Sequence, residues 1–303
     1  MTSSQRHRHR HRRRRPTGLA AALLAAGLGG LSVTGAPAMT PTVTPGARWI
    51  RPAGTPMTVF GHRGAASAAP ENTLVSDEVA RRGGAEWIED DVQPSRDGVP
   101  YVLHDDTVNR TTDGTGRVRD LTAAQLDALD AGSWFAPSYV GTRLPTLAAQ
   151  LDDLRIRGGR LLLEIKGPHT RDEVARIVQV VREHGMTDRV FVQSFQEEAL
   201  RHTRELAPEL PLGLLRSTLD PDPVATARDL GLSAYNPADE ALATRPGVVK
   251  DLHAAGVAVN VWTVDQPARW KALEAAGVDG VITNRPAELV GWNEARAQFG
   301  GAR

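Results

Sequence analysis

Histidines, carboxylates and basic residues follow short apolar runs at several places in this 303-residue chain. The residues with the clearest chemical capacity are His62, His104, Glu89, Asp91, Glu164, Arg63 and Lys166. Histidine takes up and releases protons near neutral pH, and carboxylates prefer hard divalent cations such as Ca²⁺ or Mg²⁺ to zinc. The set indicates acid–base catalysis beside a divalent ion, provided that the fold brings these segments together.

The three carboxylates are expected to face one another. Side chains alternate along a strand, so Glu89 and Asp91 of EWIEDDV point to one side, while Glu164 and Lys166 of LLLEIK share the polar side of their strand. Burying three carboxylates without a partner is costly, which predicts a bound cation. The alternative is a structural network in which Glu164 pairs with Lys166 and Glu89 with Arg63.

Two histidines would suit the cleavage of a phosphodiester. One would remove a proton from the attacking group and the other would protonate the leaving alkoxide, and either could take either part. Lys166 is one of only three lysines in the chain, so it is not a generic surface charge here, and with Arg63 it could bind phosphoryl oxygens. Four further histidines, on expected loops or helices, are interpreted as structural: His169, His184, His202 and His253.

These residues lie at the ends of strands in a regular strand–helix alternation. Strands are expected at 57–61, 86–92, 160–165, 189–194, 211–215, 232–235, 257–263 and 278–282. Helical patterns are expected at 71–83, 145–156, 171–184, 196–206, 222–230, 245–255, 266–276 and 286–297. Eight such pairs predict an α/β fold, a (β/α)₈ TIM barrel, with its chemistry at the carboxyl ends of the strands. A doubly wound open sheet is the alternative, but the chain has no glycine-rich dinucleotide-binding turn.

One connection, between the second and third strands, is unusually long at roughly sixty residues. The insertion, at about 93–143, contains a strand-like PYVLH, a turn rich in Gly and Thr, a helical LTAAQLDALD and an aromatic SWF. We expect it to form a small subdomain after strand 2 of a catalytic domain at 57–298.

The first 38 residues are typical of a signal peptide. An Arg- and His-rich stretch at 6–15 precedes an apolar run at 19–31, and Ala36-Pro37-Ala38 matches a signal-peptidase site. The apolar run is too short to span a bilayer stably. We therefore expect export by the Sec or twin-arginine route, cleavage after Ala38, no stable membrane insertion of the mature protein and an extracellular location. Residues 39–56 are expected to be a flexible lead-in, and 299–303 a tail.

The composition excludes several partners. Without the seven arginines of residues 1–15, the formal charge is 29 − 36 = −7, which argues against nucleic acid as a ligand. The chain has no cysteine, so it has no disulfide, thiol nucleophile or lipid-anchored cysteine. Nothing in the sequence identifies a protein partner.

Several motifs resemble the glycerophosphodiester phosphodiesterase family, whose barrel is of the phosphatidylinositol phospholipase C-like kind. They are HRGAASAAPENT (62–73), WIEDDVQPSRDGVPYVLHD (87–105), NRTTDGTG (109–116), LPTL (144–147), LLLEIK (161–166), FVQSF (191–195), VNVWTVD (259–265) and DGVITNRP (279–286). The family fold is a (β/α)₈ barrel with an insertion after strand 2.

The resemblance also implies an activity and a role for each site residue. Family members release sn-glycerol 3-phosphate and an alcohol from deacylated phospholipids. The resemblance implies one divalent ion, Ca²⁺ or Mg²⁺, bound by Glu89, Asp91 and Glu164. It further implies acid–base catalysis by His62 and His104, phosphate binding by Arg63 and Lys166 and a pocket lined by Trp262. We interpret Glu71, in the PENT segment, as a residue that supports the site.

Three residues depart from the family pattern: Asp90, Asp265 and Asn284. Asp90 replaces an apolar residue facing the helices and needs a partner. Asp265 and Asn284 stand where Asn and Asp are common, an exchange expected to alter substrate preference. A phospholipase D-like enzyme acting on lysophospholipid or sphingomyelin is the alternative function. A non-catalytic barrel that binds polyglycerol phosphate is a further one, but no histidine or metal carboxylate of the motif is missing.

Overall fold

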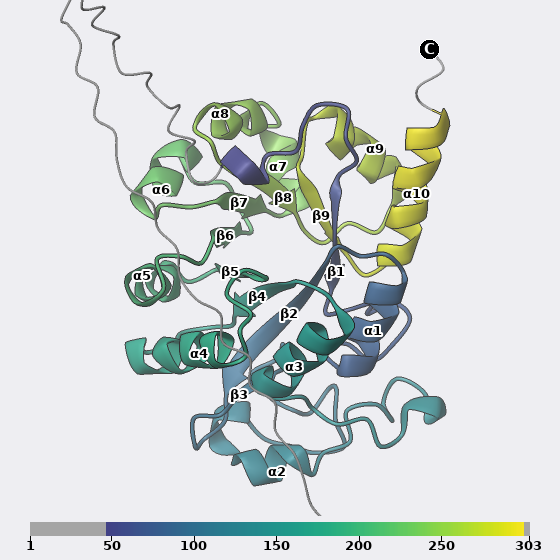
Figure 1. The fold of residues 1–303 in the computed structure, drawn as a ribbon, viewed down its shortest axis with the longest axis vertical. Helices are drawn as coiled ribbons and strands as arrows, with labels where there is room; N and C mark the ends of the chain where they lie inside the picture. Colours follow the sequence, from purple (N-terminus) through teal and green to yellow (C-terminus); the bar gives the residue numbers. More distant parts are fainter. Residues whose placement is uncertain (1–46, 300–303) are drawn as a thin grey trace, which may run out of the picture. The chain divides into compact units, whose positions relative to one another are not determined.

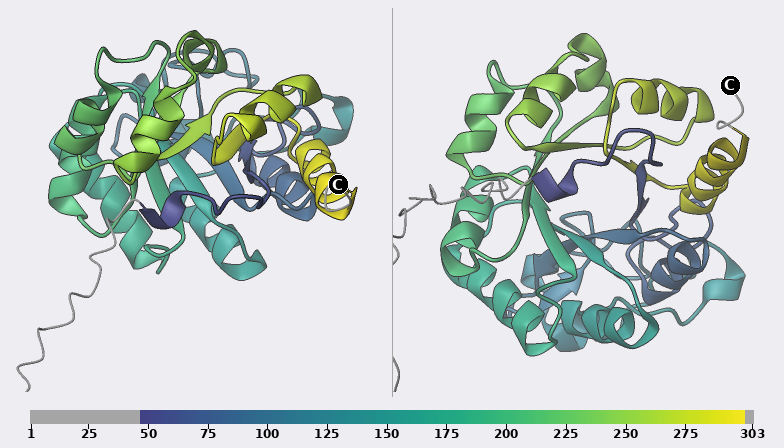
Figure 2. Two further views of the ribbon diagram at one scale, coloured as in Figure 1. Left: turned by 90° about the horizontal axis from the view of Figure 1, so that it is seen from above. Right: turned by 45° about the horizontal axis from the view of Figure 1, so that its top comes forward.

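Eight parallel strands close into a barrel in the computed structural model, which describes residues 47–299 (Figures 1 and 2). The barrel strands are β1 (Thr58–His62), β2 (Trp87–Pro94), β4 (Leu161–Ile165), β5 (Val190–Ser194), β6 (Leu212–Arg216), β7 (Ala234–Pro237), β8 (Ala258–Val261) and β9 (Gly280–Thr283). They are hydrogen-bonded in chain order, and β1 closes the barrel by pairing with both β2 and β9. The TIM barrel predicted from the sequence is confirmed.

Helices surround the barrel, as Figure 2 shows. They are α1 (Leu74–Arg82), α3 (Leu147–Arg157), α4 (Arg171–Glu183), α5 (Glu197–Leu206), α6 (Pro223–Asp229), α7 (Asp239–Thr244), α8 (Val248–Ala254), α9 (Pro267–Ala275) and α10 (Pro286–Phe299). Between β7 and β8 two helices replace the single one expected at 245–255. Pro246 explains the break, since proline fits the start of a helix but not its interior.

Alternation along the strands divides the core into two layers. One side of each strand packs against the helices in a large apolar cluster that includes Ile88, Leu163 and Val192. The other side faces the barrel interior, where the apolar cluster comprises Phe60, Trp87, Leu162, Phe191, Ala234, Ala258 and Ile282. Two residues further along β1, β2 and β4, the same interior side carries His62, Glu89 and Glu164. The barrel is therefore apolar toward its amino end and polar at its carboxyl end.

The insertion forms a small unit with its own apolar cluster. Its strand β3 (Pro100–Val102) runs antiparallel to the end of β2, so the extra strand is confirmed. Short helices follow: η2 (Val118–Asp120), α2 (Ala123–Asp127) and η3 (Pro137–Tyr139). The buried cluster comprises Tyr101, Leu103, Val108, Val118, Leu126, Ala131 and Leu144. This unit positions His104, which directly follows β3 and Leu103.

The segment before β1 packs against the amino end of the barrel. The helix η1 (Ala47–Trp49), purple in Figure 2, carries Trp49, whose ring lies 5.0 Å from Phe191 and 5.7 Å from Trp87 between centroids. Arg51 donates hydrogen bonds to the carbonyls of Val278, Thr55 and Glu274. Composition predicts a flexible lead-in here, but from residue 47 onward these contacts hold it against the barrel.

Several expectations concern residues that the structure does not describe. The signal peptide at 1–38 with its cleavage after Ala38, the first part of the lead-in and residues 300–303 of the tail lie outside the described residues. Among residues 47–299, no helix has the length and apolar character needed to cross a membrane.

Candidate active site

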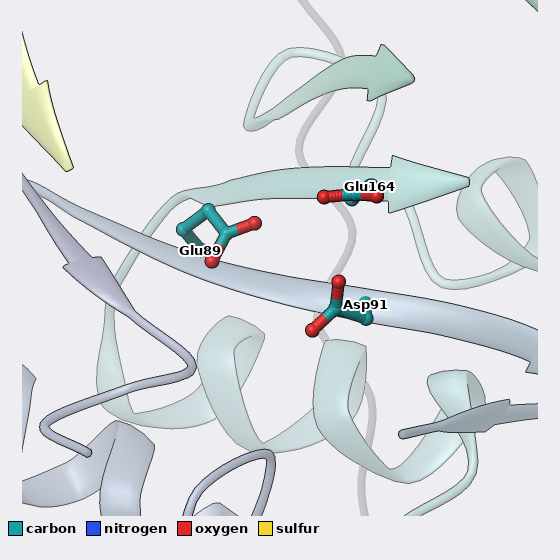
Figure 3. Close-up of side chains that lie close together, drawn as sticks. All are labelled: Glu89, Asp91 and Glu164. Carbon is teal, nitrogen blue, oxygen red and sulfur yellow. The ribbon is translucent and has the colours of Figure 1, made fainter. Parts of the chain in front are cut away.

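Three carboxylates meet at the carboxyl ends of β2 and β4. Glu89 and Asp91 project from β2 and Glu164 from β4, toward a common space (Figure 3). Each offers an oxygen within 4.8 Å of those of the other two, and all three side chains are buried. The strand register explains this meeting, because Asp91 pairs directly with Glu164. The convergence predicted from alternation is thus observed.

The electrostatics of this cluster suit a bound cation. Burial, and then repulsion from Asp91, raises the pKa of Glu164 to about 8, and the pKa of Glu89 is raised well above its ordinary value in the same way. Burial would also raise the pKa of Asp91, but Lys166 and Arg63 outweigh it and lower that pKa. Three oxygen-donor carboxylates that repel one another suit a hard divalent ion, which would stabilise all of them in the charged form.

The alternative ion-pair network is only partly formed. Lys166 Nζ lies 3.0 Å from Glu164 Oε1 and 3.6 Å from Asp91 Oδ1. Glu89, however, accepts hydrogen bonds from the Arg63 backbone N–H and the Gln193 amide, not from the Arg63 guanidinium. These neutral donors leave the charge of Glu89 poorly compensated, which favours a metal ion over a purely structural network.

His62 stands between the carboxylates and Asn284. Its Nδ1 lies 2.7 Å from Asn284 Oδ1, and its Nε2 lies 4.0 Å from Glu89 Oε2. The Asn284 amide is oriented by Asp265, which accepts a hydrogen bond from Asn284 Nδ2 at 2.8 Å. Asn284 Oδ1 can therefore only accept, so Nδ1 carries the hydrogen and Nε2 is free toward the site. Burial, followed by the charge of Arg63, lowers the pKa of His62 to about 4.

The two sequence departures after strands β8 and β9, Asp265 and Asn284, contact each other. Asp265 accepts further hydrogen bonds from Thr283 Oγ1 and from the backbone N–H of Asn284, both at 2.9 Å. The Asp265 carboxylate and the Asn284 amide thus form one hydrogen-bonded unit, and its amide oxygen contacts His62. The expected effect of this exchange on substrate preference stays a prediction.

His104 faces the same pocket from the insertion. Its Nδ1 lies 2.8 Å from Asp105 Oδ1, so the carboxylate fixes the hydrogen on Nδ1 and leaves Nε2 free. Arg110 donates to Asp105 and to Glu71. Glu71 in turn accepts a hydrogen bond of 2.7 Å from Arg63 Nη1, while its supporting role in the site stays a prediction.

Backbone geometry in the loop after β1 also serves the site. Arg63 and Asn72 both have left-handed conformations, with φ of 51° and 56°. The Asn72 side chain donates to Asp91 Oδ2 and accepts from the Asp91 backbone N–H, each at 3.1 Å. Asn72 belongs to the PENT sequence at 70–73, in which both Asn and Thr are residue types that commonly cap the start of a helix. In the structure, Thr73 caps α1 by accepting a hydrogen bond from Ser76 N–H, while Asn72 orients the Asp91 carboxylate.

A pocket of about 140 Å³ brings these residues together. Its polar wall consists of His62, His104, Arg63, Glu89, Glu164, Lys166 and Gln193. Its apolar wall includes Phe195, Leu215, Trp262 and Ile282. Trp262 donates Nε1–H to the Asn236 carbonyl and packs edge-to-face on Phe195, with centroids 5.3 Å apart.

Gln193, Phe195, Asn72, Asp105 and Arg110 were not predicted as site residues. Gln193 shares its side of β5 with the interior residue Phe191, so alternation within FVQSF could have identified it. The others lie on loops, where spacing carries no such signal.

Asp90 points away from the site into the helix layer, as predicted, and the structure identifies its partners. The Gln150 side-chain amide donates to both Asp90 Oδ2 and Asp77 Oδ2. Burial, and then the charge of Asp77, raises the pKa of Asp90, while burial raises the pKa of Asp77 to about 7.

The four remaining histidines that the structure describes are outside the pocket lining. His184 contacts Asp152, His202 contacts Glu198, His253 contacts Asp279, and His169 Nδ1 lies 3.3 Å from the Gly167 carbonyl. All four contacts lie away from this pocket, and the interpretation of these histidines as structural stays a prediction.

Comparison with known proteins gives a consistent family. Residues 62–288 match the sequence model of the Glycerophosphoryl diester phosphodiesterase family. A glycerophosphodiester phosphodiesterase of Caldanaerobacter subterraneus subsp. tengcongensis is 34% identical over 237 residues, covering 77% of this chain and 96% of that protein.

Two solved structures are also similar. A phosphodiesterase of Oleispira antarctica, in complex with the product sn-glycerol-3-phosphate, aligns with a TM-score of 0.76 and 31% identity, over 82% of this chain and 99% of that one. A glycerophosphodiester phosphodiesterase of Agrobacterium tumefaciens aligns with a TM-score of 0.70 and 32% identity, over 78% and 99%. This chain therefore belongs to the glycerophosphoryl diester phosphodiesterase family of phosphoric diester hydrolases.

Proposed function

We propose that this protein hydrolyses glycerophosphodiesters, the deacylated phospholipids, to sn-glycerol 3-phosphate and an alcohol, and that one divalent ion, Ca²⁺ or Mg²⁺, is required. The observation that carries the proposal is the cluster of Glu89, Asp91 and Glu164 within 4.8 Å, beside two histidines with free Nε2 atoms. The Oleispira antarctica relative, solved with sn-glycerol-3-phosphate, supports the same product here.

The residues of the pocket divide the chemistry among them. Glu89, Asp91 and Glu164 would hold the ion, which stabilises negative charge on the phosphoryl group when bound. Arg63 and Lys166 bind phosphoryl oxygens from two sides. Both side chains are largely buried but reach the pocket.

His62 and His104 transfer the protons. The Nε2 atom of one histidine accepts a proton from the attacking oxygen as the new P–O bond forms. The Nε2–H of the other, in its protonated form, donates to the leaving oxygen as the second P–O bond breaks. The attacking oxygen comes from water or from the glycerol hydroxyl of the substrate; in the second case the alcohol leaves as a cyclic glycerol phosphate forms, and water then opens this cyclic diester to give glycerol 3-phosphate.

The dimensions of the pocket favour a small, water-soluble substrate. A volume of about 140 Å³ accommodates a phosphate with a short polyol better than an acyl chain. Trp262 and Phe195 provide an apolar wall of limited area. This supports glycerophosphodiesters over lysophospholipids or sphingomyelin as substrates, a preference that direct comparison of their turnover tests.

An assay of the mature protein tests this function. The protein is incubated with glycerophosphocholine and Ca²⁺ or Mg²⁺, and then with EDTA, and glycerol 3-phosphate is measured by a coupled enzyme. We expect turnover that EDTA removes and that added metal restores. Absence of product with either metal, or full turnover in EDTA, would contradict the proposal. Faster release of the head group from lysophosphatidylcholine or sphingomyelin would favour the phospholipase D-like alternative, and binding of polyglycerol phosphate without turnover would favour the non-catalytic one.

We propose further that the protein acts outside the cytoplasm. The support is the sequence of residues 1–38, with its basic start, apolar run and Ala36-Pro37-Ala38. Mass spectrometry of the exported protein should find Met39 as its first residue. Recovery of the uncleaved chain from the cytoplasm alone would contradict this.

A further inference from the structure

A single guanidinium joins two carboxylates from different segments near the mouth of the pocket. Arg110 Nη1 and Nη2 donate to the two oxygens of Glu71, each at 2.8 Å. Arg110 Nε and Nη2 donate to the two oxygens of Asp105, at 2.7 and 2.9 Å. Each carboxylate is thus held by two N–H groups, which fixes its plane as well as its position.

Each of these carboxylates contacts a residue of the pocket. Asp105 Oδ1, which accepts from Arg110, also lies 2.8 Å from Nδ1 of His104. Glu71 Oε1, which accepts from Arg110, also accepts from Arg63 Nη1 at 2.7 Å. Arg110 is therefore one residue removed from both a histidine and an arginine of the polar wall.

The two branches belong to separate parts of the fold. His104, Asp105 and Arg110 lie in the insertion after β2, whereas Arg63 and Glu71 lie in the loop between β1 and α1. Mutual placement of a proton-transfer residue and a phosphate-binding residue needs a connection between these parts. The four hydrogen bonds of Arg110 provide one directly.

Stability alone does not explain the arrangement. The Arg110 side chain is 45% exposed, and most ion pairs with such exposure contribute little to the free energy of folding, although two-point contacts of an arginine contribute more. Orientation is a different matter, because a small misplacement of a catalytic group lowers the rate strongly. Asp105 must also accept from His104 in a fixed geometry, since that contact determines which ring nitrogen carries the hydrogen.

We propose that Arg110 is a positioning residue that holds His104 and Arg63 in register with each other through Asp105 and Glu71. Its effect on turnover rests on the proposed function, whereas its effect on the ring of His104 does not. Arg110 belongs to the NRTTDGTG motif, to which the sequence assigns no role.

Steady-state kinetics separate the two branches. Asp105→Asn should mainly lower kcat, through His104, and Glu71→Gln should mainly raise KM, through Arg63. Arg110→Ala should do both and lower kcat/KM by about tenfold to a hundredfold. Arg110→Lys keeps the charge but cannot hold both carboxylates in two-point contacts, so it should restore little. Guanidinium ion at millimolar concentration should restore part of the activity of Arg110→Ala.

Arg201→Ala is the matched control. Arg201 is 43% exposed and contacts two carboxylates, Asp229 and Glu197, on the outer helices. We expect unchanged kinetics and no response to guanidinium. If Arg110→Ala keeps kcat/KM within twofold of the wild type, or if it loses activity only in proportion to a lower melting temperature, Arg110 has no positioning role.

A spectroscopic measurement decides the matter without turnover. In ¹⁵N spectra of the histidine rings, His104 of the wild type should show hydrogen on Nδ1. In Arg110→Ala, the signals should move toward an average of the two tautomers, while those of His184 stay unchanged. Unchanged His104 signals would overturn the proposal. A wild-type protein that lacks turnover would contradict the proposed function, yet this measurement would still test Arg110.

Discussion

At the scale of single residues, both histidines of the pocket are hydrogen-bonded through Nδ1, but to different kinds of acceptor. For His62, the partner of Nδ1 is the amide oxygen of Asn284. For His104, the partner of Nδ1 is a carboxylate oxygen of Asp105. In both rings this places the hydrogen on Nδ1 and leaves Nε2 facing the pocket. The proposed mechanism therefore needs both rings in one defined orientation.

Replacement of His104 by alanine tests the proton-transfer role. The substitution removes one of two proton-transfer groups, so kcat should fall by about 10²–10⁴-fold. The side chain is partly exposed, so the melting temperature should change little. His184→Ala, which breaks a contact with Asp152 outside the pocket lining, is the control and should keep full activity. Substantial turnover by His104→Ala would reject the assigned role.

The contact between Asp265 and Asn284 leads to a second residue-scale prediction. Asn284→Asp places two carboxylates in contact and removes the amide donor, so both stability and kcat/KM should fall. The exchange double variant, Asp265→Asn with Asn284→Asp, restores one carboxylate and one amide and should recover much of the loss. Double-mutant analysis of kinetics and melting should give an interaction of about 1–2 kcal/mol. Strict additivity would show that the two side chains do not act as a unit.

The sequence was informative for site residues on strands or directly after strand ends, and poor for those farther along the loops. Glu89, Asp91 and Glu164 could be placed together for two reasons. Side-chain alternation puts all three on the interior face of the barrel, and the pairing of neighbouring parallel strands puts them at a similar height along the barrel axis. Arg110 could not be placed, because its partners depend on the path of two loops. The departures at Asp265 and Asn284 were interpreted as an exchange between neighbouring strand ends, but the hydrogen bonds that join the two side chains could not be derived from the sequence.

At the scale of elements, β2 is polar on both of its sides. Its interior side carries Glu89 and Asp91, and its outer side places Asp90 against α1 and α3, where Asp77 and Gln150 meet it. The sequence predicts that Asp90 faces the helices but cannot identify its partners, because they come from two different helices. Within the described residues, Asp77 Oδ1 and Gln150 Oε1 are buried without a hydrogen-bond partner, which suits a protonated carboxyl here.

This buried contact predicts that stability falls as pH rises. The pKa of Asp77 is about 7 in the folded state, because of burial, against 3.8 for an ordinary Asp. Between those values the folded chain binds more protons than the unfolded chain, so the free energy of unfolding decreases from about pH 4 to about pH 7. Asp77→Asn removes this titration and should stabilise the protein at pH 8 by about 1–3 kcal/mol, and less at pH 5.

Urea unfolding at both pH values measures this difference. The exposed Asp172→Asn is the control, with an expected change below about 0.5 kcal/mol at either pH. A gain for Asp77→Asn that is equal at pH 5 and pH 8 would contradict a raised pKa of Asp77 in the folded state.

The order of elements was predictable because the apolar runs are short and separated by clear helical patterns. Capping residues also mark helix starts. The side chains of Thr146 and Thr170 each accept a hydrogen bond from the backbone N–H of the residue three positions later in the chain. The short α7 was missed because its six residues are too few for helical periodicity to appear. The antiparallel direction of β3 follows from its pairing with β2, which no local pattern encodes.

At the scale of the whole described chain, the two ends of the barrel have separate tasks. The carboxyl end carries the polar pocket, and the amino end is covered by η1 and the segment that follows it. The rings of Trp49, Trp87 and Phe191 pack together there, and Arg51 ties this segment to the loop before β9. The composition of this segment, rich in Pro, Thr and Gly, gave no indication of these contacts.

Removal of this segment should lower stability and spare catalysis. A chain beginning at Met57 loses the apolar contacts of Trp49 and the hydrogen bonds of Arg51 that a chain beginning at Ala47 keeps. We expect a loss of about 2–4 kcal/mol, or a melting temperature lower by about 5–10 °C. Turnover at 25 °C should stay within about twofold, because the pocket lies at the opposite end of the barrel.

Trp49→Ala and Arg51→Ala, each in the longer chain, should divide the loss between packing and hydrogen bonding. Equal melting temperatures for the two chains would show that the covering segment does not stabilise the barrel, and loss of turnover in the folded shorter chain would show that the two ends are not independent.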